Sequence, residues 1–342
     1  MNSLMNQARV LVRHCLEAKA GETILIIWDG TVSADLKESC RYAIQELKAQ
    51  SFLLVCEPIW RRPLKEYCFF AGSSQRNDVS LPKIISSSLN EADAAIILNS
   101  DMDLLFAPEW DTFLKKEKRF IFLPYLSTDG AQRMLPETKE EVEELYDLVV
   151  KYGALLREGH FATLQSPQGT NLKMELGQWD TKYHSGKCGK GMRQVLPAGQ
   201  ITRVPNNGTA AGTLVIDRSI ADNDYRTLHE PIYLEIDRGD VIKISGGIEA
   251  RRLEAFLASL RDPSVYHVTE LGIGTNHRCR QTGIGAPTED THTWGTVSMA
   301  IGCDTHIGGG TPGPVHIDMT MWFPTLTIDE KIVSKEGKLV AQ

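Results

Sequence analysis

Short apolar runs alternate with amphipathic segments through residues 1–123, and this alternation restricts the fold more than any other feature of the sequence. Each run is apolar at nearly every position, which is typical of a strand buried on both faces of a parallel sheet. The predicted strands are Glu22–Trp28, Phe52–Cys56, Ala94–Leu98 and Phe120–Leu123, and the predicted helices are 1–19, 33–50, 81–90 and 108–116. Strands and helices that alternate along a chain predict a doubly wound parallel sheet.

This part of the chain lacks the sequence signatures of nucleotide-binding domains. Trp28–Thr31 follows the first strand where a G-x-G-x-x-G fingerprint would stand, and the chain has no Walker A motif. We therefore expect a Rossmann-like α/β domain that acts as a scaffold or a lid. Two further segments are predicted to be loops: 72–80, which is rich in turn residues, and Gln178–Pro205, which lies over a site or is merely solvated.

The character of the sequence changes after an acidic, amphipathic helix predicted at Pro136–Lys151. Beyond it the chain is rich in candidate strands, with one predicted helix at Ile248–Ser259. A chain of 342 residues is long enough for two domains with separate cores. We predict an α/β domain over residues 1–153 and a β-rich α+β domain, which carries a metal site, over residues 154–342.

Composition and charge exclude several classes of partner. The net charge of −7 and the pI of about 5.8 argue against binding to nucleic acid or to an anionic membrane. We expect no membrane-spanning segment and no signal peptide, because no apolar run is long enough and the start of the chain lacks a basic segment followed by an apolar one. The seven cysteines form no C-x-x-C pair, which predicts reduced thiols in a cytoplasmic protein and no thiolate zinc site.

Three side chains in the second part of the chain are candidates for a metal site. His316 and Asp318 lie two residues apart in an apolar, strand-prone run, so both side chains point to the same face. Glu270 lies in a similar apolar frame and is followed by a Gly-Ile-Gly sequence, which permits close approach of a ligand. A buried His–Asp hydrogen bond with an unrelated glutamate would explain the same residues. We favour a divalent cation held by Glu270, His316 and Asp318, because it would compensate the desolvation of all three groups.

His306 is the candidate for proton transfer or for a fourth ligand, although a solvent-facing loop histidine is an equal alternative. His267 is expected to point away from Glu270 and to play a structural role. Imidazole and carboxylate ligands without sulfur suit Fe²⁺, Mn²⁺, Zn²⁺ or Co²⁺. Such an ion could activate water for attack on an amide carbon, or bind a chelating aromatic substrate together with O₂. The G-x-S-x-G elbow of serine hydrolases is not present in the sequence.

Several motifs resemble one enzyme superfamily. Thr269–Asn276, Gly295–Gly302 and His316–Asp318 are similar to the C-terminal signatures of the aminopeptidase T-type metallopeptidases of thermophiles, a superfamily that includes the 2,5-dihydroxypyridine 5,6-dioxygenases. Two further motifs, Arg133–Pro136 and Gly212–Asp217, look closer to the dioxygenase branch. The resemblance covers most of the chain, is strongest after residue 195, and implies a homodimer or a larger homo-oligomer.

The sequence departs from both branches at positions that matter for chemistry. Gln200 and Ser298 stand where the resemblance implies a glutamate and a histidine that bind a second metal in the aminopeptidases. The dioxygenases of the superfamily bind one Fe²⁺ through two histidines and an aspartate, and here Glu270 stands in place of the first histidine. Phe106 stands where that branch has a further histidine. The resemblance therefore implies one metal ion, held by Glu270, His316 and Asp318.

These features lead us to expect a mononuclear, metal-dependent hydrolase that cleaves an amide-type C–N bond in a small molecule or a short peptide. His306 would shuttle the proton, because an imidazole titrates near neutral pH. The preference for hydrolysis depends on Glu270 and on the missing second histidine. The alternative is an Fe²⁺ dioxygenase that cleaves the ring of a hydroxylated N-heterocycle such as 2,5-dihydroxypyridine. A third hypothesis is a metal-stabilised binding protein without catalysis.

Overall fold

The computed structural model describes residues 2–56, 81–99, 107–222, 225–280 and 287–340. The chain packs as two compact units. The first unit comprises the described residues of 1–67 and 76–147 together with 184–198, and the second comprises 148–183 and the described residues from 199 onward. The predicted loop at 72–80 lies outside the described residues, and the domain boundary expected between residues 153 and 154 stays a prediction.

A parallel sheet forms the centre of the first unit. Its strands are β1 (Thr23–Trp28), β2 (Gln50–Val55), β3 (Ala94–Leu98), β4 (Arg119–Phe122) and β8 (Arg193–Val195). Among the described residues they pair in the order β2–β1–β3–β4–β8, and every pair is parallel. β1, β3 and β4 are buried at nearly every position, as expected for inner strands covered on both faces.

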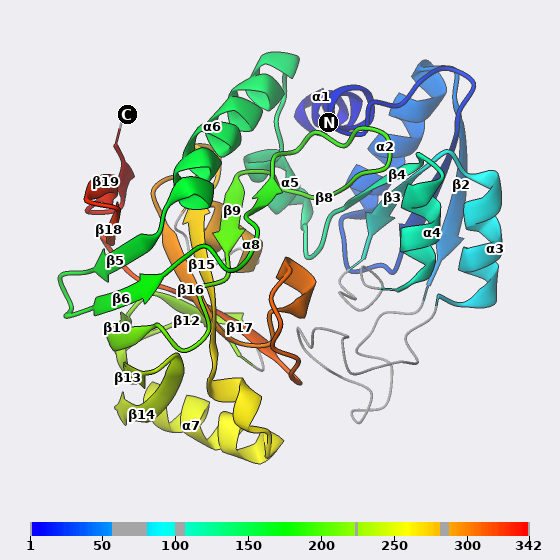
Figure 1. The fold of residues 1–342 in the computed structure, drawn as a ribbon. Helices are drawn as coiled ribbons and strands as arrows, with labels where there is room; N and C mark the ends of the chain where they lie inside the picture. The colour runs from blue at the N-terminus through cyan, green and yellow to red at the C-terminus, as the bar shows by residue number, and fades with distance from the viewer. Residues whose placement is uncertain (1, 57–80, 100–106, 223–224, 281–286, 341–342) are drawn as a thin grey trace. The chain divides into compact units, whose positions relative to one another are not determined.

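Helices cover this sheet (Figure 1). They are α1 (Asn2–Val10), which continues as a π-helical turn (Leu11–Cys15), α2 (Ala34–Glu46), α3 (Lys83–Glu91), α4 (Glu109–Lys115) and α5 (Thr128–Met134). The Ser33 side chain accepts a hydrogen bond from the backbone N–H of Leu36 and so begins α2 at the predicted cap. Trp110 of α4 joins the core formed by Leu25 and Ile27 of β1. The predicted doubly wound α/β architecture is therefore confirmed.

Helix α6 (Lys139–Glu158) contributes residues to both units. Within its described residues, the second unit also contains α7 (Ile248–Leu260), α8 (Pro287–His292) and two antiparallel sheets. The strands of the first sheet are β5 (Phe161–Gln165), β6 (Asn171–Glu175), β10 (Ala211–Ile216), β13 (Ile232–Asp237), β14 (Asp240–Gly246), β18 (Thr325–Ile328), β19 (Lys331–Lys335) and β20 (Lys338–Leu339). Their order is β14–β13–β10–β6–β5–β18–β19–β20 in the part of the chain that is described. The β-rich architecture predicted for this part of the chain is confirmed.

The second antiparallel sheet carries the candidate site. Its strands are β7 (Lys182–His184), β9 (Gln200–Arg203), β11 (Ser219–Ala221), β12 (Tyr225–Thr227), β15 (Val268–Gly274), β16 (Val297–Gly302) and β17 (His316–Thr320), and the described strands are ordered β12–β11–β17–β16–β15–β9–β7. Ile317 and Met319 of β17 enter the apolar core shared with the other sheet. Because side chains alternate along a strand, His316 and Asp318 lie on the opposite face.

The expectation that Gln178–Pro205 is a loop was wrong for three short stretches of it. β7, β8 and β9 lie in this segment, and β8 pairs with β4 in the parallel sheet. Strands of three or four residues are too short to show an alternating pattern of apolar and polar positions, which explains why the sequence did not indicate them. No helix in the described ranges has the length and apolarity needed to cross a membrane.

Candidate metal centre

The three candidate ligands come from β15 and β17. These two strands flank β16 in the second antiparallel sheet (Figure 1). In the strand register Glu270 is opposite Ala300, and Ala300 is opposite Asp318. Residues directly opposite one another in antiparallel strands share a face of the sheet. The small side chain of Ala300 therefore leaves room for Glu270 and Asp318 to approach each other. His316 is opposite Gly302, one row along the same face.

The ligand atoms of Glu270, His316 and Asp318 all lie within 4.8 Å of one another. His316 Nε2 is 3.5 Å from Glu270 Oε2 and 3.4 Å from Asp318 Oδ1. Glu270 and His316 are only 3% and 4% exposed, while Asp318 is half-buried. The structure thus brings together all three residues that the sequence predicted as metal ligands, and their number and spacing are those of a group that could hold one ion.

A main-chain carbonyl fixes the orientation of His316. His316 Nδ1 lies 2.6 Å from the carbonyl oxygen of Cys303. Because a carbonyl oxygen can only accept, Nδ1 carries the hydrogen and donates it. In the neutral form of the ring, the lone pair is therefore on Nε2, the nitrogen that faces the two carboxylates. Metal-binding histidines are held in this way by a hydrogen bond from the other ring nitrogen.

The carbonyl of Cys303 is itself held in place by Gly302. The backbone N–H of Cys303 donates to the carbonyl of Val315 at 2.6 Å. Gly302 has a φ of +108°, and a Cβ built on it would lie 2.1 Å from the same Val315 oxygen. Only glycine fits this position. The close approach of the two chain segments therefore sets where the His316 ring is anchored.

Proton binding at the centre is strongly altered by burial and by neighbouring charge. Burial raises the pKa of Glu270, and the charge of Asp318 raises it further, while the hydrogen bond with His316 opposes both effects. Burial alone would lower the pKa of His316, but its hydrogen bonds with Asp318 and Glu270 outweigh that effect and hold it well above the usual value. The two carboxylates therefore attract positive charge, which a proton or a metal ion can supply.

The residues present fit a divalent cation. Two carboxylates and one neutral imidazole supply oxygen and nitrogen donors, which suit borderline and hard divalent metals, and they would leave positions open for exogenous ligands. A metal would also neutralise two acidic groups that are costly to bury close together. We therefore describe the group as a candidate site for one metal ion.

His306, the residue predicted to transfer protons, lies beside this group. Its ring meets the ring of His316 edge to face, with the centroids 4.4 Å apart. His306 lies on a short 3₁₀ turn (Thr305–Ile307), and the loop around it is closed by Asp304, whose Oδ1 accepts from the backbone N–H of Thr311 at 2.6 Å. His267 contacts Asp240 at 3.0 Å, in line with a structural role.

Two features of the centre were missed by the sequence analysis. The carbonyl of Cys303 carries no sequence signal, since every residue has such an acceptor. Gln200 was considered only as a poor metal ligand, yet its Nε2 lies 3.4 Å from Glu270 Oε1. Phe106, which stands where the resemblance expects a histidine, lies outside the described residues.

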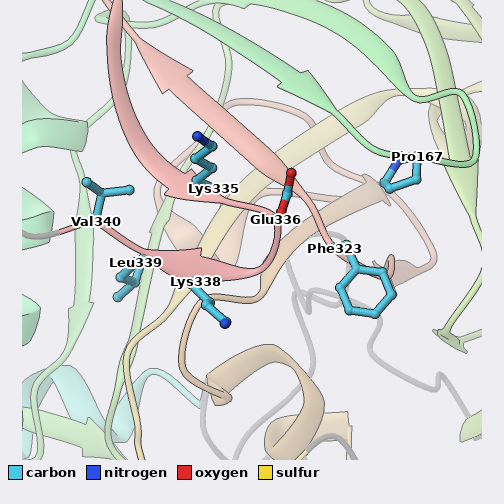
Figure 2. A pocket seen from close by; sticks show the side chains of 7 residues that line it. All are labelled: Pro167, Phe323, Lys335, Glu336, Lys338, Leu339 and Val340. Atoms are coloured by element: carbon cyan, nitrogen blue, oxygen red, sulfur yellow. The ribbon is translucent and has the colours of Figure 1, made fainter.

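A separate pocket of about 520 Å³ lies on the hairpin formed by β19 and β20 (Figure 2). The residues that line it are Pro167, Phe323, Lys335, Glu336, Lys338, Leu339 and Val340. None of the candidate metal ligands contributes to this lining, so we assign the pocket no part in the chemistry of the centre.

Solved structures show which fold the chain shares with known proteins. The structure of the 2,5-dihydroxypyridine dioxygenase from Pseudomonas putida KT2440 aligns with a TM-score of 0.81 at 22% identity, covering 99% of this chain and 97% of that chain. AmpT from Thermus thermophilus aligns with a TM-score of 0.69 at 14% identity, covering 99% of each chain. Both proteins share the fold of this chain.

Sequence comparison decides between the branches. The 2,5-dihydroxypyridine 5,6-dioxygenase of Pseudomonas putida KT2440 is 28% identical over 258 residues, which cover 73% of this chain and 72% of that enzyme. The expectation of an amide hydrolase was wrong, because these matches point to the dioxygenase that we had considered as the alternative. The preference for hydrolysis depended on Glu270, but a carboxylate ligand is compatible with both hydrolysis and oxygen chemistry. The sequence model of the 2,5-dihydroxypyridine 5,6-dioxygenase (NicX) family matches residues 5–341, so this chain belongs to that family.

Proposed function

We propose that this protein is a metal-dependent dioxygenase that opens the ring of a hydroxylated N-heterocycle of the 2,5-dihydroxypyridine type. The observation that carries the proposal is the family match over residues 5–341, joined to a buried Glu270–His316–Asp318 group that could hold one metal ion. A single metal with open positions suits a substrate that chelates through neighbouring ring atoms. The substrate class comes from the family and not from the geometry of the centre.

Fe²⁺ is the metal that we propose for the centre. When bound, it would supply the one-electron chemistry that reaction with O₂ requires. Zn²⁺ could occupy the same donors but cannot change its oxidation state, and it therefore provides a matched inactive metal. The protein's own contribution is to hold two negative oxygens and one neutral nitrogen in fixed positions. The hydrogen bond from His316 to Cys303 keeps the imidazole in the tautomer that binds.

His306 is proposed to accept the proton of a substrate hydroxyl. Its ring lies against His316, so a group bound at the centre would be within its reach. Its imidazole is suited to proton transfer near neutral pH, whereas Phe106 cannot transfer a proton. We expect His306→Gln to retain the metal but to lower kcat by about 100-fold or more, as is typical for loss of a general base.

The proposed activity is tested by measuring oxygen uptake. Protein loaded anaerobically with Fe²⁺ should consume O₂ in equimolar amounts with 2,5-dihydroxypyridine, while the Zn²⁺-loaded protein should bind the substrate without consuming O₂. Substrate turnover under argon, or the absence of O₂ uptake by protein that contains a full complement of Fe²⁺, would contradict the proposal. The metal content of each sample is measured by elemental analysis.

A further inference from the structure

The pocket on the hairpin of β19 and β20 has walls that are fixed to one another. The backbone N–H of Gly337, in the turn of the hairpin, donates to the carbonyl of Pro324 at 2.8 Å. The backbone N–H of Glu336 donates to the side-chain oxygen of Thr325 at 3.1 Å. The hairpin is thereby tied to the connection between β17 and β18, which carries Phe323, the aromatic residue of the lining. Walls that are already in place lose little freedom when a ligand binds.

Two lysine side chains give this pocket a positive charge. Lys335 and Lys338 are directly opposite one another in the antiparallel pair of β19 and β20. Side chains in such a pair share a face of the sheet, and like charges there destabilise the pairing of the strands. Neither ammonium group forms an ion pair with a described residue. Glu336 is the one acidic residue in the described lining, so one net positive charge remains.

Phe323 has an unusual backbone conformation beside the hairpin. Its φ is +53°, which is uncommon for a bulky residue. It also precedes Pro324, and a residue before proline favours extended backbone. Burial in the core does not explain this conformation, because the side chain is 57% exposed. Residues held in such conformations concentrate at functional sites, so the strain points to a role for the exposed ring.

The backbone of β20 offers a hydrogen-bond donor beside Lys338. The N–H of Val340 donates to the carbonyl of Val333 at 3.0 Å. Hydrogen-bonded and non-hydrogen-bonded positions alternate along an antiparallel pair. Leu339, which is opposite Ser334, therefore directs its N–H away from β19. Because β20 is the last strand of its sheet in the described chain, this N–H faces the open edge, where an anion could accept from it.

The rest of the lining suits a flat apolar ring. Phe323, Pro167, Leu339 and Val340 supply apolar surface, and an aromatic ring can pack against that of Phe323. Figure 2 shows Lys338 between Leu339 and Phe323, so a ring that packs against Phe323 would bring a charged substituent near an ammonium group. The volume of about 520 Å³ lies within the range of about 300–1,000 Å³ that is typical of small-molecule sites.

We propose that this pocket is a second ligand site, separate from the metal centre, for a small aromatic carboxylate. The carboxylate would accept hydrogen bonds from the ammonium groups of Lys335 and Lys338 and from the backbone N–H of Leu339. A single negative charge matches the net charge of the lining and relieves the repulsion between the two lysines. The proposal does not depend on the chemistry of the metal centre, so it stands or falls independently of the proposed function.

Calorimetric titration of the full-length, Zn²⁺-loaded protein with benzoate tests the proposal. Acetate supplies the same charged group without a ring, and benzyl alcohol supplies the ring without a charge. Benzoate should bind saturably and about 3–5-fold or more tightly than either, since a partly exposed ion pair and an aromatic contact each contribute a factor of this size.

Variants assign the binding to the pocket. Lys338→Ala should weaken benzoate binding by about 3–5-fold, the effect of one partly exposed ion pair. Phe323→Ala should weaken it by about 2–10-fold, the effect of one aromatic pair. Lys331→Ala and Phe161→Ala are the matched controls, because Lys331 is an exposed lysine of the same hairpin and Phe161 is 61% exposed, yet neither lines the pocket. Both controls should bind benzoate as the wild type does.

The proposal is overturned if benzoate does not bind saturably, or if acetate or benzyl alcohol binds as tightly. It is also overturned if Lys338→Ala and Phe323→Ala bind benzoate as tightly as their controls, because the carboxylate would then be bound elsewhere, as on the metal ion. All four side chains are exposed, so each variant should keep the fold, and an unchanged Tm confirms this for each sample.

Discussion

At the scale of single residues, the centre depends on Glu270 facing two environments. One carboxylate oxygen faces His316 and the other faces Gln200 and Gly272. A histidine could present only one lone pair to the metal, because its second ring nitrogen needs a hydrogen to stay neutral. The glutamate therefore presents an additional acceptor beside the candidate metal ligands.

Removing a candidate ligand should remove the metal. His316→Ala and Asp318→Ala each take away one donor of a set of three. His316→Ala also leaves the buried Glu270 without its imidazole partner. We expect both variants to be purified with less than about a tenth of the wild-type metal content, since even partners that only orient ligands affect affinity about 10–100-fold. His267→Ala is the matched control, as His267 contacts Asp240 instead, and it should retain the metal. Metal retention by the first two variants would exclude the site.

Metal binding should release protons and strengthen as the pH rises. The pKa values of Glu270 and His316 are both raised, so a metal ion competes with protons at these groups over a higher pH range than at an ordinary carboxyl group and imidazole. For the same reason, the stability that these protons give the metal-free fold is lost as pH rises through the raised pKa values. We expect a larger metal-induced increase in Tm at pH 8 than at pH 6. Calorimetry in buffers of different ionisation enthalpy counts the protons released, and a count of zero would refute this coupling.

At the scale of elements, the centre is set by how β15, β16 and β17 are paired. The register shifts between Val268 and Glu270, where β15 carries a bulge against β16. A bulge re-aims the side chains that follow it, and here it places Glu270 in the row of Asp318. Gly302 at the end of β16 then lets the next segment return close enough to anchor His316.

Gly302→Ala should therefore damage both stability and metal binding. Gly177→Ala is the matched control, because Gly177 has a φ of +127° but has nothing within 4 Å of the added Cβ. The control should cost about 1–2 kcal/mol of unfolding free energy from backbone strain alone. Gly302→Ala should cost about 1–3 kcal/mol more, because its Cβ would also collide with Val315. Urea unfolding checks the difference, and equal losses in the two variants would argue against a role for the close approach.

The sequence indicated which three side chains lie together better than it indicated how they are held. His316 and Asp318 were found because a spacing of two residues fixes a shared face of a strand. Glu270 was found from its apolar frame and the glycines that follow it. No local pattern indicates that its strand, β15, lies next but one to β17 in the sheet. The bulge at Val268 and the Cys303 carbonyl depend on pairing between distant segments, and no single-sequence pattern reports such pairing.

At the scale of the whole molecule, the first unit is not formed by one continuous stretch. Residues 184–198 return to it and supply β8, the strand that covers the edge of β4. The backbone N–H of Leu196 donates to the carbonyl of Phe122 at 2.8 Å, and that of Phe120 donates to the carbonyl of Met192 at 3.2 Å. β4 is fully buried and would expose an unpaired edge without this strand.

A fragment of residues 1–153 should accordingly aggregate, because its sheet ends at an apolar, unpaired β4. An added peptide of residues 184–198 should bind the fragment and keep it in solution, whereas a scrambled peptide of the same composition should not. Sedimentation and hydrogen exchange at Phe120 and Phe122 check this outcome. A fragment that stays monomeric without the peptide would contradict the prediction and support residue 153 as the end of an independent domain.

The homo-oligomer and the cytoplasmic location stay predictions. Light scattering after size-exclusion chromatography tests the first, and a particle mass equal to that of one chain, 38.1 kDa, would contradict it.

The late position of β8 in the chain has a consequence for biosynthesis. A ribosome that has translated only about the first 160 codons has released β1, β2, β3 and β4 but not β8. The edge of β4 that β8 covers is therefore unpaired in the nascent chain. At about 5–20 residues per second, β8 is synthesised and can pair with β4 within several seconds. Synonymous codons that slow elongation between Leu156 and Ala198 would prolong this interval and increase the dependence of the newborn protein on chaperones.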